Sequence, residues 1–255
     1  MFIRTARPRS TPHTGRAARG GLAAVCLGSA ALLASCSSTP QAVSCVETGD
    51  SLVPAAVSVV KGAPAASVVL SGTELPVGIR ILPISGAQLE QLTNQLSGRA
   101  EGATFSPAGC AQPSAFGGKV DTGALGLVVG QAGTGPISES VVKQKADFGN
   151  VSENVTGKCR TVTVTVRTAQ GVGATRVTYT PVAVPQTAAS RVVAVRQDTV
   201  TVSGGRTTAA HMLTAWAAVG PYTVTVTQNG STGEPDQRLF DQVLVTATAK
   251  AAKAS

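Results

Sequence analysis

The chain has 255 residues, 43% of them hydrophobic, with 21 lysines and arginines against 13 acidic residues. The basic excess lies at the N-terminus, because residues 1–35 hold five arginines and no acid, which leaves 16 basic and 13 acidic side chains and a net charge of +3. This small charge and the lack of a basic stripe interleaved with aromatic residues argue against nucleic-acid binding. Beyond residue 36 no run approaches about 18 apolar residues, so no transmembrane helix is expected there.

The N-terminal segment has the parts of a bacterial secretory signal. All five arginines precede residues 21–33 (GLAAVCLGSAALL), an apolar run too short to cross a bilayer and of the right length for a signal h-region. The run ends in LASC at residues 33–36, which resembles the lipobox of bacterial lipoproteins. In such signals the cysteine thiol receives a diacylglyceryl group, the peptide is cut just before it, and the new amino group is acylated. We therefore predict a signal peptide over residues 1–35 and a lipid anchor on Cys36.

The anchor predicts where the protein resides. Two or more acyl chains suffice for stable attachment, so we expect a lipoprotein on the outer face of the cytoplasmic membrane. The alternative is an ordinary secreted protein in which Cys36 is incidental. Residues 36–50 are predicted to form the lipidated N-terminus and a flexible tether, and residues 51–255 a single domain. The Ala, Gly, Val, Thr and Arg bias is typical of a high-GC genome and favours an actinobacterial source.

A short strand over residues 75–84 and a helix over residues 87–97 are predicted first within the domain. Ser85 and Gln88 have the spacing of a capping box, and Gly98 suits the helix end. Three leucines recur at helical spacing between them, at Leu89, Leu92 and Leu96. Two strands joined by a glycine-rich loop follow at 124–131 and 137–142, and then a polar, helical segment at 145–157.

The C-terminal half has strong strand signals. Valine and threonine alternate from residue 161 to 166, the period-two pattern of a half-buried strand. Further strands are predicted over 176–180, 191–202, 207–219 and 222–228, and the turn residues between them favour an antiparallel meander. The final helix, residues 235–250, has an apolar face made of Leu239, Phe240, Val243, Leu244 and Ala247. The predicted fold class is α+β, a curved antiparallel β-sheet with helices packed on one face.

Three cysteines remain after cleavage and lipidation, namely Cys45, Cys110 and Cys159. An odd number leaves one unpaired if a disulfide forms. We favour a disulfide between Cys110 and Cys159, since both lie within the folded part. Cys45, close to the tether, is either free or paired instead.

Several landmarks together resemble a known family. They are LPVG at 75–78 before a helix, SPAGC at 106–110, GKC at 157–159 opening a Thr/Val strand, the strand that starts at Tyr222, and a closing amphipathic helix. Their order resembles the envelope lipoproteins and sensor-domain proteins of mycobacteria, and is similar to the extracellular sensor domain of the PknH-type serine/threonine kinases. The resemblance covers about residues 70–250 and implies an α+β domain, stapled by disulfides, with a groove for an unidentified envelope ligand. The kinase-linked members have four domain cysteines, so the second bridge is in doubt here, and signalling would need a protein partner.

No catalytic constellation stands out. His211 is the one histidine beyond the signal, and without a G-x-S-x-G elbow a structural role is preferred to a serine–histidine pair. One histidine and scattered cysteines also lack the spacing of metal ligands. The Asp-Thr-Gly motif at Asp121 occurs once, whereas aspartic proteases need two such aspartates. We therefore predict no catalytic residue, metal or cofactor.

Two functions from different classes remain. The first is a non-enzymatic, sensor-like or ligand-binding module. Trp216 and Met212 are candidate groove residues because both point to the same side of a regular strand, although a packing role in the core is the preferred interpretation of both. The second is a lipid or glycolipid carrier, which would need a continuous apolar cavity of several hundred Å3 or more. The sequence identifies neither the envelope ligand nor a protein partner.

Overall fold

A computed structural model describes residues 64–98, 102–118, 120–168, 171–203, 205–230 and 233–255. The predicted signal peptide, the predicted lipidation site Cys36, the predicted tether and Cys45 lie outside the described residues. The structure therefore concerns the domain that the anchor is expected to hold.

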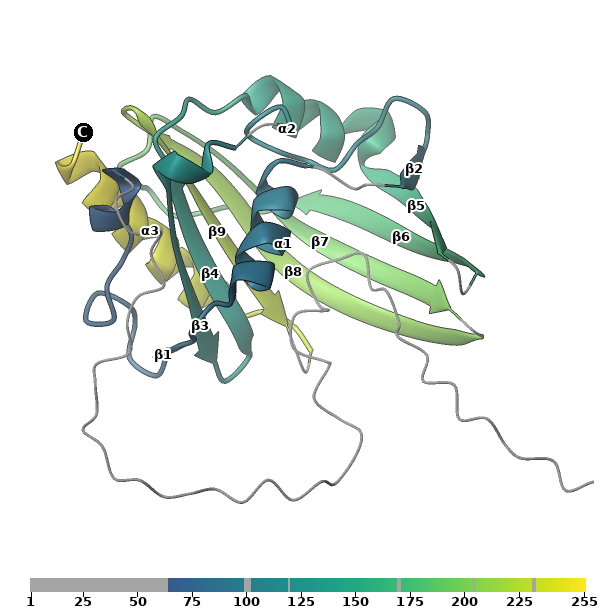
Figure 1. Cartoon of the computed structure of the whole chain (residues 1–255), viewed down its shortest axis with the longest axis horizontal. Helices are drawn as coiled ribbons and strands as arrows, with labels where there is room; N and C mark the ends of the chain where they lie inside the picture. Colours follow the sequence, from purple (N-terminus) through teal and green to yellow (C-terminus); the bar gives the residue numbers. More distant parts are fainter. Residues whose placement is uncertain (1–63, 99–101, 119, 169–170, 204, 231–232) are drawn as a thin grey trace, which may run out of the picture.

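One nine-stranded antiparallel sheet organises the described residues (Figure 1). The strands run in the order β1-β3-β4-β9-β8-β7-β6-β5-β2. Their bounds are β1 (Arg80–Ile81), β2 (Ala103–Ser106), β3 (Leu125–Ala132), β4 (Gly135–Val142), β5 (Thr161–Thr168), β6 (Gly171–Pro181), β7 (Arg191–Ser203), β8 (Arg206–Val219) and β9 (Tyr222–Gly230). Strands β5 to β9 form the predicted meander, and the predicted β3–β4 hairpin joins it beside β9. Of the strand predicted over 75–84, only the two residues of β1 are a strand in the structure. Strand β2 was not predicted.

Three α-helices accompany the sheet, α1 (Gly86–Leu96), α2 (Phe148–Val155) and α3 (Gln237–Lys253). The predicted capping box starts α1, since the Ser85 hydroxyl accepts the Gln88 N–H and the Gln88 side chain accepts the Ser85 N–H. Gly98 follows α1 at a φ of 69°, a left-handed conformation that favours glycine. Asp236 caps α3, so the helix begins two residues later than predicted.

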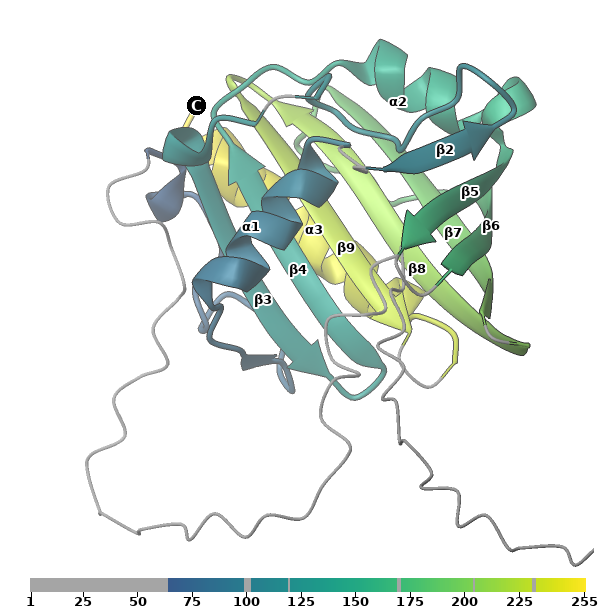
Figure 2. The same ribbon diagram turned by 45° about the vertical axis from the view of Figure 1, so that its right-hand side comes forward.

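The prediction that the helices pack on one face is wrong. Helix α3 lies on one face of the sheet, while α1 and α2 lie on the other (Figure 2). The physical reason is the composition of the central strands, where Trp216 is buried toward one face while Ala215 and Ala217 are buried toward the other. Both faces are therefore apolar enough to need covering.

A hydrophobic cluster lies between α3 and the sheet and is called the α3 core here. It contains the predicted apolar face of α3. Four α3 side chains, Phe240, Val243, Leu244 and Ala247, pack against Ala215 and Ala217 of β8 and Val224 and Val226 of β9. The 3-10 turn at Pro64–Ser67 packs against β3 on this side. It approaches so closely that a Cβ at Gly126 would overlap Val69 and the backbone of Ala65.

The disulfide core lies on the opposite face. It combines apolar residues of α2 with Val162, Val164 and Trp216 of the sheet and with the Cys110–Cys159 disulfide. The predicted pairing is thus confirmed, with the two Cα atoms 5.5 Å apart. The bridge joins the loop after β2 to the segment that opens β5.

Glu139 is a buried carboxyl group on the α3 side of β4, with only 1% of its surface exposed. Its Oε2 accepts the Leu70 N–H at 2.9 Å, and its Oε1 has no hydrogen-bond partner among the described residues. The nearby cation, Lys250, donates instead to Glu74 Oε2 at 2.6 Å and to the Val69 carbonyl at 2.8 Å. Burial raises the pKa of Glu139 to about 8, because the carboxylate would lose its hydration; the Leu70 N–H and the Lys250 charge offset this only in part.

This raised pKa predicts a pH-dependent stability. In the unfolded chain the carboxyl titrates near 4.5, so between that pH and about 8 the folded protein holds a proton that the unfolded chain releases. The contribution of Glu139 to stability is complete below pH 4.5, is lost progressively as the pH rises from 4.5, and is gone once the pH has passed 8. Glu139→Gln keeps an acceptor for Leu70 and never ionises. We expect the variant to match the wild type near pH 5 and to exceed its free energy of unfolding by about 4 kcal/mol near pH 9.

Urea unfolding at a series of pH values measures this difference. Glu153→Gln, an exposed position on α2, is the matched control and should leave the pH profile unchanged. Parallel pH profiles for Glu139→Gln and the wild type would show that Glu139 does not titrate differently in the folded protein.

Candidate ligand-binding pocket

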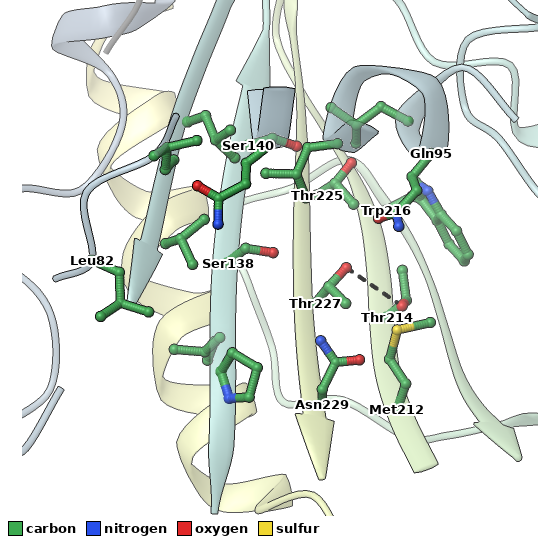
Figure 3. Close-up of a pocket in the computed structure, with 18 of the residues that line it drawn as sticks. Leu82, Gln95, Ser138, Ser140, Met212, Thr214, Trp216, Thr225, Thr227 and Asn229 are labelled. Carbon is green, nitrogen blue, oxygen red and sulfur yellow. Dashed lines mark hydrogen bonds between the residues drawn. The ribbon is translucent and has the colours of Figure 1, made fainter. Parts of the chain in front are cut away.

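A pocket of about 140 Å3 lies between α1 and the sheet face opposite α3. The connection from β1 to α1 and the helix itself form its roof, and strands β3, β4, β9 and β8 form its floor (Figure 3). The lining residues are Leu82, Pro83, Ile84, Gln88, Leu92, Gln95, Leu96, Gln112, Pro113, Leu127, Val129, Pro136, Ile137, Ser138, Ser140, Gln197, Met212, Thr214, Trp216, Thr225, Thr227 and Asn229.

Strand register arranges the floor in three rows across the sheet. The first, here called the deep row, consists of Leu127, Ser140, Thr225 and Trp216, which are neighbours on β3, β4, β9 and β8. The middle row consists of Val129, Ser138, Thr227 and Thr214 on the same strands. The mouth row consists of Pro136, Asn229, Met212 and Gln197. In the deep and middle rows, polar side chains occupy the centre and an apolar side chain closes the β3 end.

Burial decreases from the deep row to the mouth row. All four deep-row residues are buried, whereas the mouth-row residues are all half-buried. Three of the middle-row residues are half-buried and Thr214 is buried. The pocket therefore has a closed end at Trp216 and Thr225 and an accessible end at Met212 and Asn229.

None of the lining residues has an ionisable side chain. The polar groups are hydroxyls and amides, which serve as hydrogen-bond donors and acceptors without charge. An ionic group placed here would lose hydration and meet no counter-ion in the lining, which is unfavourable. The lining therefore selects for an uncharged occupant.

The Thr225 hydroxyl is the unusual group in the floor. Thr225 is 4% exposed, and its Oγ1 has no hydrogen-bond partner among the described residues. Its neighbours on the same face do have partners: Thr223 Oγ1 donates to the Gln144 carbonyl at 2.6 Å, and the hydroxyls of Thr214 and Thr227 lie 3.5 Å apart (Figure 3). A buried hydroxyl without a partner costs about 1–3 kcal/mol. The Thr225 Oγ1 atom is itself shielded, so a ligand in the pocket recovers this cost once the neighbouring side chains shift to expose the hydroxyl.

The roof is tied to the rest of the domain at the C-terminal end of α1. Ser114 Oγ donates to the Leu96 carbonyl at 2.6 Å, and Gln112 Nε2 donates to the Gln95 carbonyl at 3.4 Å. The Ala111 N–H donates to Asn154 Oδ1 of α2 at 2.7 Å. Because residue 110 of the same segment forms the disulfide to Cys159, covalent and hydrogen bonds together hold α1 above the floor.

The predicted groove residues Trp216 and Met212 both line this pocket, in the deep row and the mouth row. That they contact a ligand remains a prediction. The hydroxyls of β4 and β9 were not predicted as pocket groups, although every second residue is Ser or Thr from 138 to 140 and from 223 to 227. That pattern ordinarily marks a solvent-facing strand surface, and only the position of α1 turns it into the floor of a pocket.

His211 lies outside the pocket, on the α3 side of β8. Its Nδ1 is 2.6 Å from Asp198 Oδ1 and 3.2 Å from an Arg196 Nη atom, which also donates to Glu234 before α3. Partial burial would raise the pKa of Asp198, but the hydrogen bonds from His211 and Arg196 outweigh it and hold this pKa below its usual value. The charged network joins β7, β8 and the approach to α3, as expected for a structural histidine.

The described residues contain neither a metal site nor a membrane-spanning helix. No group of three or more His, Cys, Asp or Glu side chains is arranged there to hold a metal ion. None of the helices in the described ranges is long and apolar enough to span a membrane.

Comparison with known proteins gives one weak structural similarity. No protein-family model matches this sequence, and no curated protein matches it either. The crystal structure of an uncharacterized protein of Mycobacterium smegmatis, the Rv0999 ortholog, aligns with a TM-score of 0.44 and 16% sequence identity. The alignment covers 75% of this chain and 98% of the mycobacterial one.

Replacing Thr225 by valine tests whether its hydroxyl is unpartnered. Thr225→Val removes a buried polar group and nearly keeps the shape, so we expect the free energy of unfolding of the ligand-free protein to rise by about 1 kcal/mol. Thr223→Val, two residues away on the same face, removes a hydroxyl that is hydrogen-bonded and should lower the stability by about 1 kcal/mol. Chemical denaturation of both variants measures the two shifts. Shifts of the same sign would contradict the assignment of different hydrogen-bonding states to the two hydroxyls.

Proposed function

We propose that this protein is a membrane-anchored, extracytoplasmic lipoprotein that binds a small ligand in the pocket beneath α1 and has no catalytic activity. The buried, unpartnered Thr225 hydroxyl at the closed end of that pocket carries the proposal. A surface furrow formed by chance would leave such a hydroxyl to water. A site shaped for a ligand places it where the ligand completes its hydrogen bonding.

The chemistry of the lining favours binding over catalysis. General acid–base catalysis requires a titratable group within reach of the substrate, and nucleophilic catalysis requires a base beside the nucleophile. The lining offers several hydroxyls but no histidine, carboxylate, lysine or cysteine to activate them. The His211–Asp198 pair is directed to Arg196 on the other side of the sheet.

A carrier of acylated lipids is less well supported. Such a carrier needs a continuous apolar cavity of several hundred Å3 or more. The pocket has about 140 Å3, and hydroxyls and amides occupy the centre of its floor. The full acyl chain of a membrane lipid exceeds this volume.

The anchor would place the pocket at the membrane surface. The LASC sequence at residues 33–36 follows an apolar run, the arrangement of a lipoprotein signal. Diacylglyceryl and N-acyl groups on Cys36 would then hold the domain on the outer face of the cytoplasmic membrane. A sensor role of the PknH type would in addition require a protein partner that responds to the ligand.

The anchor is tested by replacing the lipidated cysteine. We expect the wild-type chain, produced in an actinobacterial host with a labelled fatty acid, to incorporate the label and to fractionate with membranes. Cys36→Ser should lose the acyl label, because serine lacks the thiol that is modified. Cys45→Ser is the matched control and should be labelled like the wild type. A Cys36→Ser protein that keeps both its label and its membrane association would rule out the lipobox.

Ligand occupancy is tested with a variant that fills the pocket. The wild-type protein is purified from the same host and denatured, and the released small molecules are identified by mass spectrometry. We expect Ser138→Leu, which places a larger side chain in the middle row, to release much less of the compound that the wild type releases. Thr163→Leu, at an exposed position on β5, is the control and should behave like the wild type. Equal release from all three proteins, or none from any, would overturn the pocket as the binding site.

A further inference from the structure

We infer that the pocket binds an uncharged sugar ring, one hexopyranose unit, with its hydroxyls on the Ser/Thr rows and its apolar C–H surface against Trp216 and the β3 side chains. This inference rests on the proposed function and names the ligand class. The sugar could belong to a soluble glycan or to the headgroup of a glycolipid, since both present the same ring.

The uncharged lining of the pocket limits the classes of ligand that can bind. No residue of the lining is ionisable, so a phosphate, carboxylate or ammonium group would enter without a counter-ion. Lys250, Glu74 and Glu139 are engaged on the opposite, α3 side of the sheet. Anionic and cationic ligands are therefore disfavoured, and a neutral molecule remains.

The hydroxyl and amide groups of the floor restrict the ligand to molecules that can form hydrogen bonds. Purely apolar ligands would cover the hydroxyls of Ser138, Ser140 and Thr225 without bonding to them, at a cost for each group left unpaired. A ligand that bears several hydroxyls can donate to and accept from these groups and the side-chain amides of Gln95 and Asn229. At the closed end, a hydroxyl of the ligand would provide the hydrogen-bond partner that Thr225 Oγ1 lacks.

The apolar walls and the size select a ring. Leu127 and Val129 close the β3 side of the floor, and Trp216 and Met212 lie on the β8 side. A pyranose has an apolar C–H surface and a polar rim of hydroxyls, which match such walls around a polar centre. A cavity of about 150 Å3 holds benzene, an unsubstituted six-membered ring, in a well-studied protein. The pocket volume of about 140 Å3 is similar, so it accommodates the ring of a hexopyranose, and the substituents of the ring need the additional room at the open mouth row.

The burial gradient sets the direction of binding. A terminal sugar would reach the deep row at Thr225 and Trp216, and the remainder of a glycan or a lipid would leave past Met212 and Asn229 in the mouth row. This direction accommodates both sources of the sugar, because the half-buried end of the pocket continues to the surface.

The protein contains a single tryptophan, so its fluorescence reports on the deep row directly. The full-length lipidated protein is reconstituted in phosphatidylcholine vesicles and titrated with methyl hexopyranosides and neutral trisaccharides, up to about 50 mM to cover millimolar affinities. A second set of vesicles contains the same sugars on diacylglycerol. We expect saturable changes in Trp216 emission with at least one neutral sugar; a response to soluble sugars indicates a glycan, and a response only to the lipid-linked form indicates a headgroup.

Variants connect the response to the pocket. Thr225→Val should weaken binding by about tenfold, while Thr225→Ser, which keeps the hydroxyl, should bind within about twofold of the wild type. Thr163→Val on exposed β5 is the matched control and should bind normally. If Thr225→Val binds as tightly as the wild type, Thr225 is not the partner of the sugar and the inference is wrong.

Matched probes separate failure of this inference from failure of the proposed function. Binding of the corresponding glucuronide or glucosamine as tightly as the neutral hexoside would overturn the neutral-ligand argument. Equal or tighter binding of cyclohexylmethanol would show an apolar ring site, which overturns the sugar while the pocket function stands. If no sugar binds but a compound is released from the wild type and not from Ser138→Leu, the sugar is again wrong and the pocket function stands. If neither assay detects a ligand, both proposals fail.

Discussion

The packing of α3 against strands β8 and β9 determines what the other face of the sheet can do. Side chains alternate strictly between the faces of a strand, so burying Ala215, Val224 and Val226 under α3 sends their neighbours Trp216 and Thr225 to the opposite face. A shift of one residue in β9 would place its threonines under α3 and its valines in the pocket, and the same shift in β8 would place Trp216 under α3 and Ala215 in the pocket. The hydrophobic free energy of the α3 core therefore fixes the register that aligns the hydroxyl rows across β4, β9 and β8.

The roof depends on a different set of contacts. Helix α1 covers the polar floor because the segment after β2 holds its C-terminal end, through the Ser114–Leu96 hydrogen bond, while the Cys110–Cys159 disulfide fastens that segment to the sheet. The sheet face opposite α3 thus has two regions, one covered by packed side chains and one that borders a pocket. Near β5 and β6 it is filled by the disulfide core, and under α1 it leaves space.

Much of the fold could be predicted from the sequence because residues close together in the chain determine most of its helices and strands. The Val/Thr alternation of β5, the Ser85–Gln88 capping box and the apolar stripe of α3 each act within a few residues, and all three appear where expected. The side of the sheet on which a helix packs is a long-range property, and there the prediction failed. The hydroxyl floor was missed for the same reason. Trp216 and Met212 could be selected because they are rare residues, whereas Thr225 is one of many threonines, and only its burial without a partner distinguishes it.

Two buried oxygens lack partners in the described residues, and their chemistry differs in a way that bears on function. Glu139 Oε1 belongs to a group that can take up a proton, and its pKa of about 8 shows that the folded protein relieves the burial by neutralising the carboxylate. The Thr225 hydroxyl has no such alternative, because it does not titrate and the cost of its burial persists at every pH. A ligand that reached this oxygen would supply its missing hydrogen bond. On the α3 side of the sheet protonation removes the charge of the unsatisfied carboxyl group, whereas on the pocket side the cost of the unsatisfied hydroxyl persists beside an empty space, which is the arrangement expected where stability is given up for binding.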